Sequence, residues 1–83
     1  MTLLYFAWVR QKIGKNEETI DLPSSVSTVG DLIAHLKTLG GGYAEAFGDI
    51  ARVRAAVDQE HAPLEANIRD AKEVAFFPPV TGG

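Results

Sequence analysis

Apolar residues along this 83-residue chain fall into short blocks that alternate with polar ones, and the first block predicts a strand. Thr2–Val9 is rich in large apolar and aromatic residues, which is typical of a β-strand. Both faces of this strand are apolar, with Leu3, Tyr5 and Ala7 on one face and Leu4, Phe6 and Trp8 on the other. A strand with one solvated face usually has polar residues on it, so we expect the second face to be covered as well.

Two shorter elements are predicted after the first strand. Arg10–Ile13 is expected to form a helical turn that ends at Gly14, because glycine is favoured just past a helix C-terminus. Glu17–Leu22 then alternates polar and apolar positions, which predicts a second strand with Ile20 and Leu22 facing inward.

The clearest predicted element is a helix that begins after Thr28. Thr28 carries the hydroxyl of a typical N-cap residue, and Asp31 lies three residues later, where a capping box places a carboxylate. Gly40-Gly41-Gly42 is predicted to end the helix. The apolar residues between these signals have helical spacing and form one stripe that can cover one sheet: Val29, Leu32, Ile33, Leu36 and Leu39.

The second half of the chain contains further strands. Tyr43–Phe47 is predicted to add a helical turn, and Arg52–Val57 reads as a third strand. His61–Leu64 is at most a short edge strand because Pro63 interrupts it, and Asn67–Lys72 has the composition of a turn. Strands on both sides of a helix indicate an α+β fold, in which a right-handed crossover makes the last strand parallel to its partner.

The last predicted strand, Glu73–Phe77, has two different faces. Val74 and Phe76 lie on one face, and Ala75 and Phe77 lie on the other. The aliphatic stripe of the helix leaves room for Phe76, whereas Ala75 could not fill that layer. We therefore expect Phe76 in the core and Phe77 on the opposite face, in a partner-docking patch with Leu4 and Phe6.

Composition predicts one globular domain with a small core. Hydrophobic residues make up 46% and charged residues 23% of the chain, both close to average. The net charge of −3 disfavours nucleic acid and favours a basic groove on a protein partner. The apolar run Leu3–Val9 is too short for a membrane span and lacks a basic leader, so we expect a cytoplasmic protein that does not bind membranes.

Most of the chain offers no catalytic or metal-binding motif. It contains no cysteine, which excludes a disulfide, a thiolate metal site and a cysteine persulfide. The two histidines, His35 and His61, lack metal-ligand spacing, so we expect no metal and no cofactor bound by this chain. Glu17 and Glu18 point to opposite faces of a strand, which leaves no general acid–base pair.

The C-terminal residues are the exception. Pro78 and Pro79 end the last strand while keeping the chain extended, and Val80 and Thr81 lead to Gly82 and Gly83. Without Cβ atoms the two glycines make a tail thin enough for a narrow channel, and they leave a terminal carboxylate open to attack. Residues 78–83, fully extended, reach roughly 20 Å beyond a domain formed by residues 1–77. We expect this tail to enter another protein's active site.

Three segments resemble a known family. Val74-Ala75-Phe76-Phe77-Pro78-Pro79-Val80-Thr81-Gly82-Gly83 is similar to the C-terminus of the small subunit of molybdopterin synthase, the MoaD family of ubiquitin-like sulfur carriers. Phe6–Arg10 and Ala55–Gln59 are also similar to that family. Two positions differ, since Asp58 stands where the family usually has Asn, and Ala71 replaces a turn glycine. Alanine at position 71 argues against a turn that needs a positive φ there.

The resemblance implies a β-grasp, or ubiquitin-like, fold with the first and last strands central and parallel. It also implies that an activating enzyme uses ATP and Mg²⁺ to adenylate Gly83, and that a sulfur donor protein then converts Gly83 to a thiocarboxylate. The tail would deliver this sulfur to cyclic pyranopterin monophosphate in the large subunit, within a heterotetramer. The catalytic groups would belong to the partners, and this chain would dock through Leu4, Phe6, Arg10 and Phe77.

Three alternatives remain open from the sequence. The same tail could serve a ubiquitin-like modifier that is conjugated to lysines, or a sulfur carrier for thiamine or another product. The chain could also be a β-grasp binding module with an idle tail.

Overall fold

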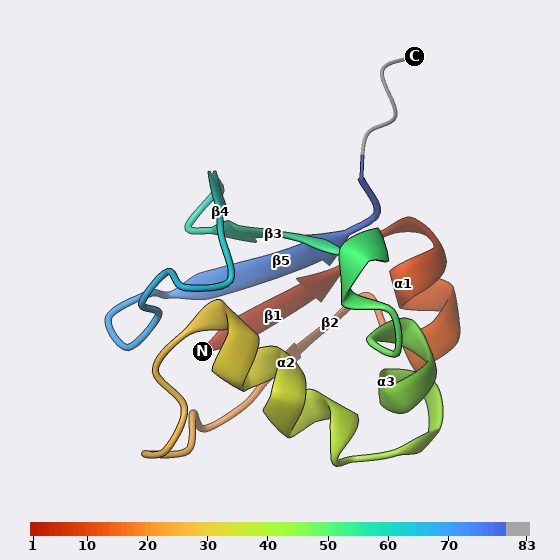
Figure 1. Ribbon diagram of the computed structural model, residues 1–83, viewed down its shortest axis with the longest axis horizontal. Helices are drawn as coiled ribbons and strands as arrows, with labels where there is room; N and C mark the ends of the chain where they lie inside the picture. The colour runs from red at the N-terminus through yellow and green to blue at the C-terminus, as the bar shows by residue number, and fades with distance from the viewer. Residues whose placement is uncertain (80–83) are drawn as a thin grey trace.

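The first and last strands lie side by side and parallel at the centre of a five-stranded mixed sheet (Figure 1). The computed structural model describes residues 1–79 of the chain. The strand order in the sheet is β2-β1-β5-β3-β4, and only the β1–β5 pair among these neighbours is parallel. The strands are β1 (Thr2–Tyr5), β2 (Glu17–Thr19), β3 (Arg54–Val57), β4 (Glu60–Ala62) and β5 (Glu73–Phe77).

Helix α2 (Val29–Lys37) lies across one face of this sheet, and α1 (Ala7–Ile13) and α3 (Gly41–Ala46) pack at one end of it (Figure 1). This is the β-grasp arrangement that the family resemblance implied, with the main helix on one face and the terminal strands at the centre. A short 3₁₀ helix, η1 (Ile50–Arg52), precedes β3.

The start of α2 confirms the predicted capping box. The Asp31 backbone N–H donates to Thr28 Oγ1 at 3.1 Å, and the Thr28 backbone N–H donates to Asp31 Oδ2 at 3.2 Å. Backbone hydrogen bonds from Ser27 and Thr28 lower the pKa of the Asp31 carboxyl. Four of the five predicted stripe residues are buried, but Leu39 is 55% exposed because the helix has already ended at Lys37.

The prediction that Thr2–Val9 is one strand was wrong beyond Tyr5. The Phe6 backbone N–H still donates to the Phe76 carbonyl, after which Ala7 takes a φ of +53° and α1 begins. Val9 is therefore a fully buried residue of α1. Trp8 and Val9 belong to this helix and not to a strand with two apolar faces. The predicted helix end at Gly14 is confirmed, since Gly14 has a φ of +87° and its N–H bonds the Arg10 carbonyl.

Other boundaries differ by a few residues. The second strand ends at Thr19 instead of Leu22, although Ile20 and Leu22 still pack partly buried against the core. Residues 50–52 form η1, so the third strand starts at Arg54, and β4 ends at Ala62, just before Pro63. The predicted turn at Tyr43–Phe47 is confirmed as part of α3, which starts earlier, within the glycine run.

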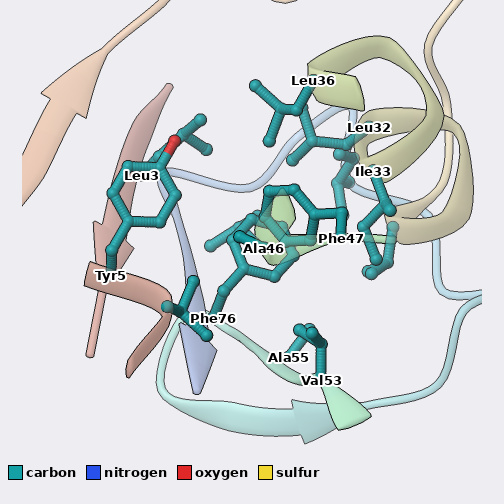
Figure 2. Close-up of a cluster of buried hydrophobic side chains, with 14 of the residues drawn as sticks. Leu3, Tyr5, Leu32, Ile33, Leu36, Ala46, Phe47, Val53, Ala55 and Phe76 are labelled. Carbon is teal, nitrogen blue, oxygen red and sulfur yellow. The ribbon is translucent and has the colours of Figure 1, made fainter. Parts of the chain in front are cut away.

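Aromatic rings fill the centre of the core between α2 and the sheet (Figure 2). The Phe76 ring stacks on Tyr5, with centroids 6.2 Å apart, and meets the edge of Phe47 at 5.0 Å. Phe47 and Phe76 have no exposed area, and the aliphatic residues of α2 cover them. The prediction that Phe76 belongs to the core is confirmed.

A two-residue turn links β3 to β4. Asp58 and Gln59 both have positive φ, +48° and +73°, as a two-residue hairpin of this twist requires. Asp58 Oδ1 also accepts hydrogen bonds from the backbone N–H groups of Lys72 and Glu73 at 2.9 and 3.0 Å. Ala71 is not among the residues with positive φ, as expected from its side chain.

Candidate functional site

The tail leaves the sheet at Phe76 and Phe77, the last residues of β5, which we call the tail root. The strands on both sides of β5 hold these residues in place. Tyr5 of β1 pairs with Phe76, and Arg54 of β3 pairs with Phe77. The Phe6 N–H adds a hydrogen bond to the Phe76 carbonyl at 3.0 Å. Pro78 and Pro79 follow and are partly buried, so the chain leaves the sheet from a fixed point.

The predicted tail residues beyond Pro79 lie outside the described residues. These are Val80, Thr81, Gly82 and Gly83. The division into a domain of residues 1–77 and a tail of residues 78–83 stays a prediction, although β5 does end at Phe77.

The strand register brings Phe77 and Leu4 to the sheet face that α2 does not cover. Val74 and Phe76 have no exposed area, whereas Phe77 is partly exposed on the opposite face. Leu4 pairs with Ala75 and is partly exposed on that same face. Phe6 follows Tyr5 at the end of β1 and is 47% exposed. We name the surface formed by Leu4, Phe6 and Phe77 the outer patch.

Arg10 lies one helical turn after Phe6. Its backbone N–H donates to the Phe6 carbonyl at 3.4 Å, and its side chain is exposed. A docking role for these four residues stays a prediction.

Three neighbours of the tail root could not be read from the sequence. The His61 ring of β4 meets the edge of Phe77 with centroids 5.2 Å apart. Arg54 lies across from Phe77, and the Arg52 guanidinium sits over the Trp8 ring at 5.4 Å. Their positions follow from the pairing of β3 with β4 and β5, which residue spacing alone does not determine.

A polar cluster joins β1, β2 and α3 on the core side of the sheet. Glu18 Oε2 accepts hydrogen bonds from the hydroxyls of Tyr5 at 2.7 Å and Tyr43 at 2.6 Å. Lys15 Nζ donates to Glu18 Oε1 at 3.0 Å and to the Tyr43 hydroxyl at 3.1 Å. Each group has partners that satisfy it, so the cluster is an internal structural link.

The pKa values of this cluster reflect its hydrogen bonds. Burial raises the pKa of Glu18, but hydrogen bonds from Tyr43, Tyr5 and Lys15 outweigh burial and leave it below its usual value. Burial and the Glu18 carboxylate raise the pKa values of Tyr5 and Tyr43. Hydrogen bonds to Tyr43 and Glu18 raise the pKa of Lys15.

Metal-ligating residues do not gather within residues 1–79. No group of three or more histidine or acidic side chains there could hold a metal ion. His35 is partly buried on α2, and His61 is exposed on β4. Over the same residues, the helices are all too short to cross a membrane.

Comparison with known proteins covers almost the whole chain. Residues 3–83 match the ThiS family. The chain belongs to the ThiS family. This match includes the tail as well as the β-grasp domain, so the family extends over both parts of the predicted organisation.

Several proteins similar to this chain carry the name molybdopterin synthase sulfur carrier subunit. The chain is 35% identical over 83 residues to the one from Haemophilus influenzae, with 100% of this chain and 99% of the relative covered. It is 36% identical over 81 residues to the one from Escherichia coli, covering 98% and 96%. These relatives confirm the resemblance to the small subunit of molybdopterin synthase.

Solved structures confirm the β-grasp fold. A putative molybdopterin converting factor, subunit 1, from Pyrococcus furiosus superposes with a TM-score of 0.74 at 32% identity, covering 95% of each chain. Small archaeal modifier protein 1 from H. volcanii superposes with a TM-score of 0.70 at 26% identity, covering 96% of this chain and 97% of its own.

Proposed function

We propose that this protein is the sulfur carrier subunit of a molybdopterin synthase and acts in molybdenum cofactor biosynthesis. The observation that carries this proposal is the similarity to relatives of that name at 33–36% identity over at least 98% of this chain. The β-grasp domain with its tail root at the end of a central strand is consistent with the same role.

In this proposal Gly83 carries the sulfur. An activating enzyme that binds ATP and Mg²⁺ joins the Gly83 carboxylate to AMP and releases pyrophosphate, which converts a poor electrophile into a reactive acyl group. A donor protein then supplies sulfur at the oxidation level of sulfide, which attacks the acyl carbon and forms the C–S bond while AMP leaves, and the product is a thiocarboxylate. The absence of cysteine supports this assignment, because no thiol of the chain could carry a persulfide.

The large subunit is the proposed recipient. The outer patch and Arg10 would dock on it, and the tail would place Gly83 beside cyclic pyranopterin monophosphate in its active site. Pro78 to Gly82 would span the distance between the docked domain and the reacting atom. Two such pairs would form a heterotetramer, and the catalytic acid and base groups would belong to the large subunit.

Intact-mass measurement tests the role of Gly83. The full chain, incubated with the activating enzyme, ATP, Mg²⁺ and a sulfur donor, should gain the mass that replaces one oxygen by one sulfur. A chain that lacks Gly83, or that has one residue added after it, should melt at the same temperature yet remain unloaded. Loading of the chain that lacks Gly83 would refute the assignment.

Gly82→Val tests the narrow channel. Branching at Cβ stiffens and widens the tail, so this variant should fold normally but transfer sulfur slowly to the precursor in the large subunit. Turnover equal to that of the unmodified chain would show that no narrow channel surrounds position 82.

A second candidate is a ubiquitin-like modifier that forms isopeptide bonds through Gly83. The structural similarity to small archaeal modifier protein 1 supports this second candidate. The two roles differ in the acceptor. Formation of molybdopterin from the loaded chain, the large subunit and the pterin precursor supports the first, whereas covalent attachment to lysines without molybdopterin formation supports the second. A carrier for thiamine would be loaded but would support neither reaction.

A further inference from the structure

Three arginines lie on the segments that flank the end of β5, where the tail leaves the sheet. Arg54 of β3 pairs with Phe77 in the strand register, and Arg52 lies two residues earlier in η1. Arg10 lies on α1, which packs against β5 and starts directly after Phe6 (Figure 1). We name Arg10, Arg52 and Arg54 the arginine collar.

Two guanidinium groups of the arginine collar are held in place by the fold. One terminal nitrogen of Arg54 donates hydrogen bonds to the carbonyls of Ala51 and Val53, at 3.1 and 3.2 Å. The Arg52 guanidinium lies over the Trp8 ring. Both arginines are exposed, so they present charge to solvent while losing little conformational freedom on binding.

Carboxylates of the same chain do not neutralise these charges. Within residues 1–79, the ion pairs involve lysines only, Lys12 with Glu45 and Lys15 with Glu18. Asp49 and Glu45 line the same hollow as Arg52, but neither forms an ion pair with it within the described residues: Asp49 accepts the Ala51 N–H, and Glu45 pairs with Lys12. The collar therefore keeps its positive charge although the chain has a net charge of −3.

The opposite end of the sheet carries more acidic than basic residues. The β3–β4 hairpin, the loop before β5 and the first residue of β5 carry Asp58, Glu60, Asp70 and Glu73, beside Arg69 and Lys72. A partner attracted by the net charge would be basic and would meet this far end. A partner that approaches the tail root instead meets three arginines.

We propose that the arginine collar docks on a ring of carboxylates around the channel entrance of the large subunit that receives the tail. This proposal rests on the proposed function, which requires the large subunit to cover the tail root. Guanidinium groups bind carboxylates in a planar, two-pronged geometry, and complementary charge speeds encounter and fixes orientation. The collar would orient the domain so that the tail enters first.

Matched charge reversals test the proposal on the full chain with the isolated large subunit. Arg52→Glu and Arg54→Glu should each slow association about 10-fold or more at low salt, because one of three attractive charges becomes repulsive. Lys72→Glu is the control, since it changes the charge equally at the far end and its exposed side chain is distant from the tail root. Arg54→Lys should keep most of the rate.

The salt dependence of the association rate distinguishes long-range electrostatic attraction from a loss of packing at the interface. Added NaCl should slow association of the unmodified chain and of the control, and should affect the collar variants less. Thermal melting of each variant checks that it is folded.

The outcomes distinguish the two proposals. Equal association rates and salt dependence for collar variants and control would overturn the collar proposal while leaving the proposed function intact. Failure of the unmodified chain to bind the large subunit would overturn both. Tight binding of the unmodified chain, but not of the collar variants, to a single-stranded oligonucleotide in physiological salt would assign the collar to nucleic acid and overturn its role in docking.

Discussion

At the scale of single residues, Phe76 and Phe77 show how adjacent identical side chains acquire different roles. The pleat of β5 turns Phe76 into the core against Phe47 and Tyr5, where it has no exposed area. The same pleat turns Phe77 to the other face, where it meets His61 at the base of the tail. Truncating each residue should therefore affect a different property.

We predict that Phe76→Ala lowers the free energy of unfolding by about 3–5 kcal/mol, because it leaves a large cavity. Phe77→Ala should instead leave the domain folded. If Phe77 is a buried anchor in the complex, its loss costs about 2–4 kcal/mol of binding, or roughly 30- to 1000-fold in Kd for the large subunit. Urea unfolding and a binding titration of both variants measure the two effects. A collapsed unfolding midpoint for Phe77→Ala would contradict the assignment of faces.

Single residues could be assigned from sequence where the determining physics is local. The two-residue period of a strand and the size of the side chains predicted the faces of Phe76 and Phe77. The exposed position of Leu39 could not be predicted, because its spacing continues the apolar stripe of α2 although the backbone leaves the helix before it. The pairing of His61 with Phe77 required the register of two strand pairs.

At the scale of elements, Gly42 determines how closely α3 packs against α1. A Cβ atom at position 42 would lie 2.0 Å from the Lys12 carbonyl oxygen, which is part of the backbone and cannot rotate away. The prediction that the glycine run ends α2 was wrong, because α2 ends at Lys37 and the run instead begins α3. Gly40 precedes α3 with a φ of +73°, and Gly42 allows the close contact between helices.

We predict that Gly42→Ala lowers the free energy of unfolding by about 3 kcal/mol or more, at the upper end of overpacking effects, since α1 and α3 must separate. Gly30→Ala is the matched control within a helix. Its nearest atom would be 3.4 Å away, and alanine is a better helix former than glycine, so the change should be within about 1 kcal/mol. Thermal or urea unfolding compares the two variants, and equal stability would show that α3 can shift freely.

The ends of helices and strands could be predicted from the sequence where residues close to one another in the chain determine them. Thr28 and Asp31 fixed the start of α2 because the capping box is a contact between residues three apart. The switch from β1 to α1 was missed because it depends on the pairing of Phe6 with Phe76, seventy positions later in the chain. It also requires a positive φ at Ala7, a conformation that alanine rarely adopts.

At the scale of the whole molecule, Glu18 connects parts of the chain that are remote in sequence. Its carboxylate joins β2 to Tyr5 of β1, to Tyr43 of α3 and to Lys15. The side chain is only 18% exposed, so these hydrogen bonds are largely protected from water. The role of Glu18 could not be predicted from the sequence, because its partners come together only after the sheet and α3 have assembled.

We predict that this cluster makes the domain sensitive to acid. The pKa of Glu18 is lower in the folded chain than the usual value of about 4.3, so its contribution to stability is present above that pH and is lost as the pH falls through the folded pKa. Glu18→Gln should lower the free energy of unfolding by about 1–3 kcal/mol at pH 7, where hydrogen bonds to the carboxylate are lost. The difference from the unmodified chain should shrink below pH 4.

Urea unfolding between pH 7 and pH 3 measures this effect, with Glu17→Gln as the control at the exposed neighbouring position. Asp31, whose pKa is also lowered, contributes acid sensitivity of the same sign in all three chains. Parallel loss of stability with pH for Glu18→Gln and the unmodified chain would show that Glu18 does not contribute.

The position of β5 also links the integrity of the tail to the integrity of the fold. The same five residues supply the middle of the sheet and the base of the tail. A protease that trims the chain past Pro78 and into β5 removes Phe77 and then Phe76, and with them the strand on which β1 and β3 both pair. We expect such a copy to unfold and to be degraded. Copies trimmed into β5 therefore do not persist as folded competitors on a partner's docking surface, unlike copies that lose Gly83 alone.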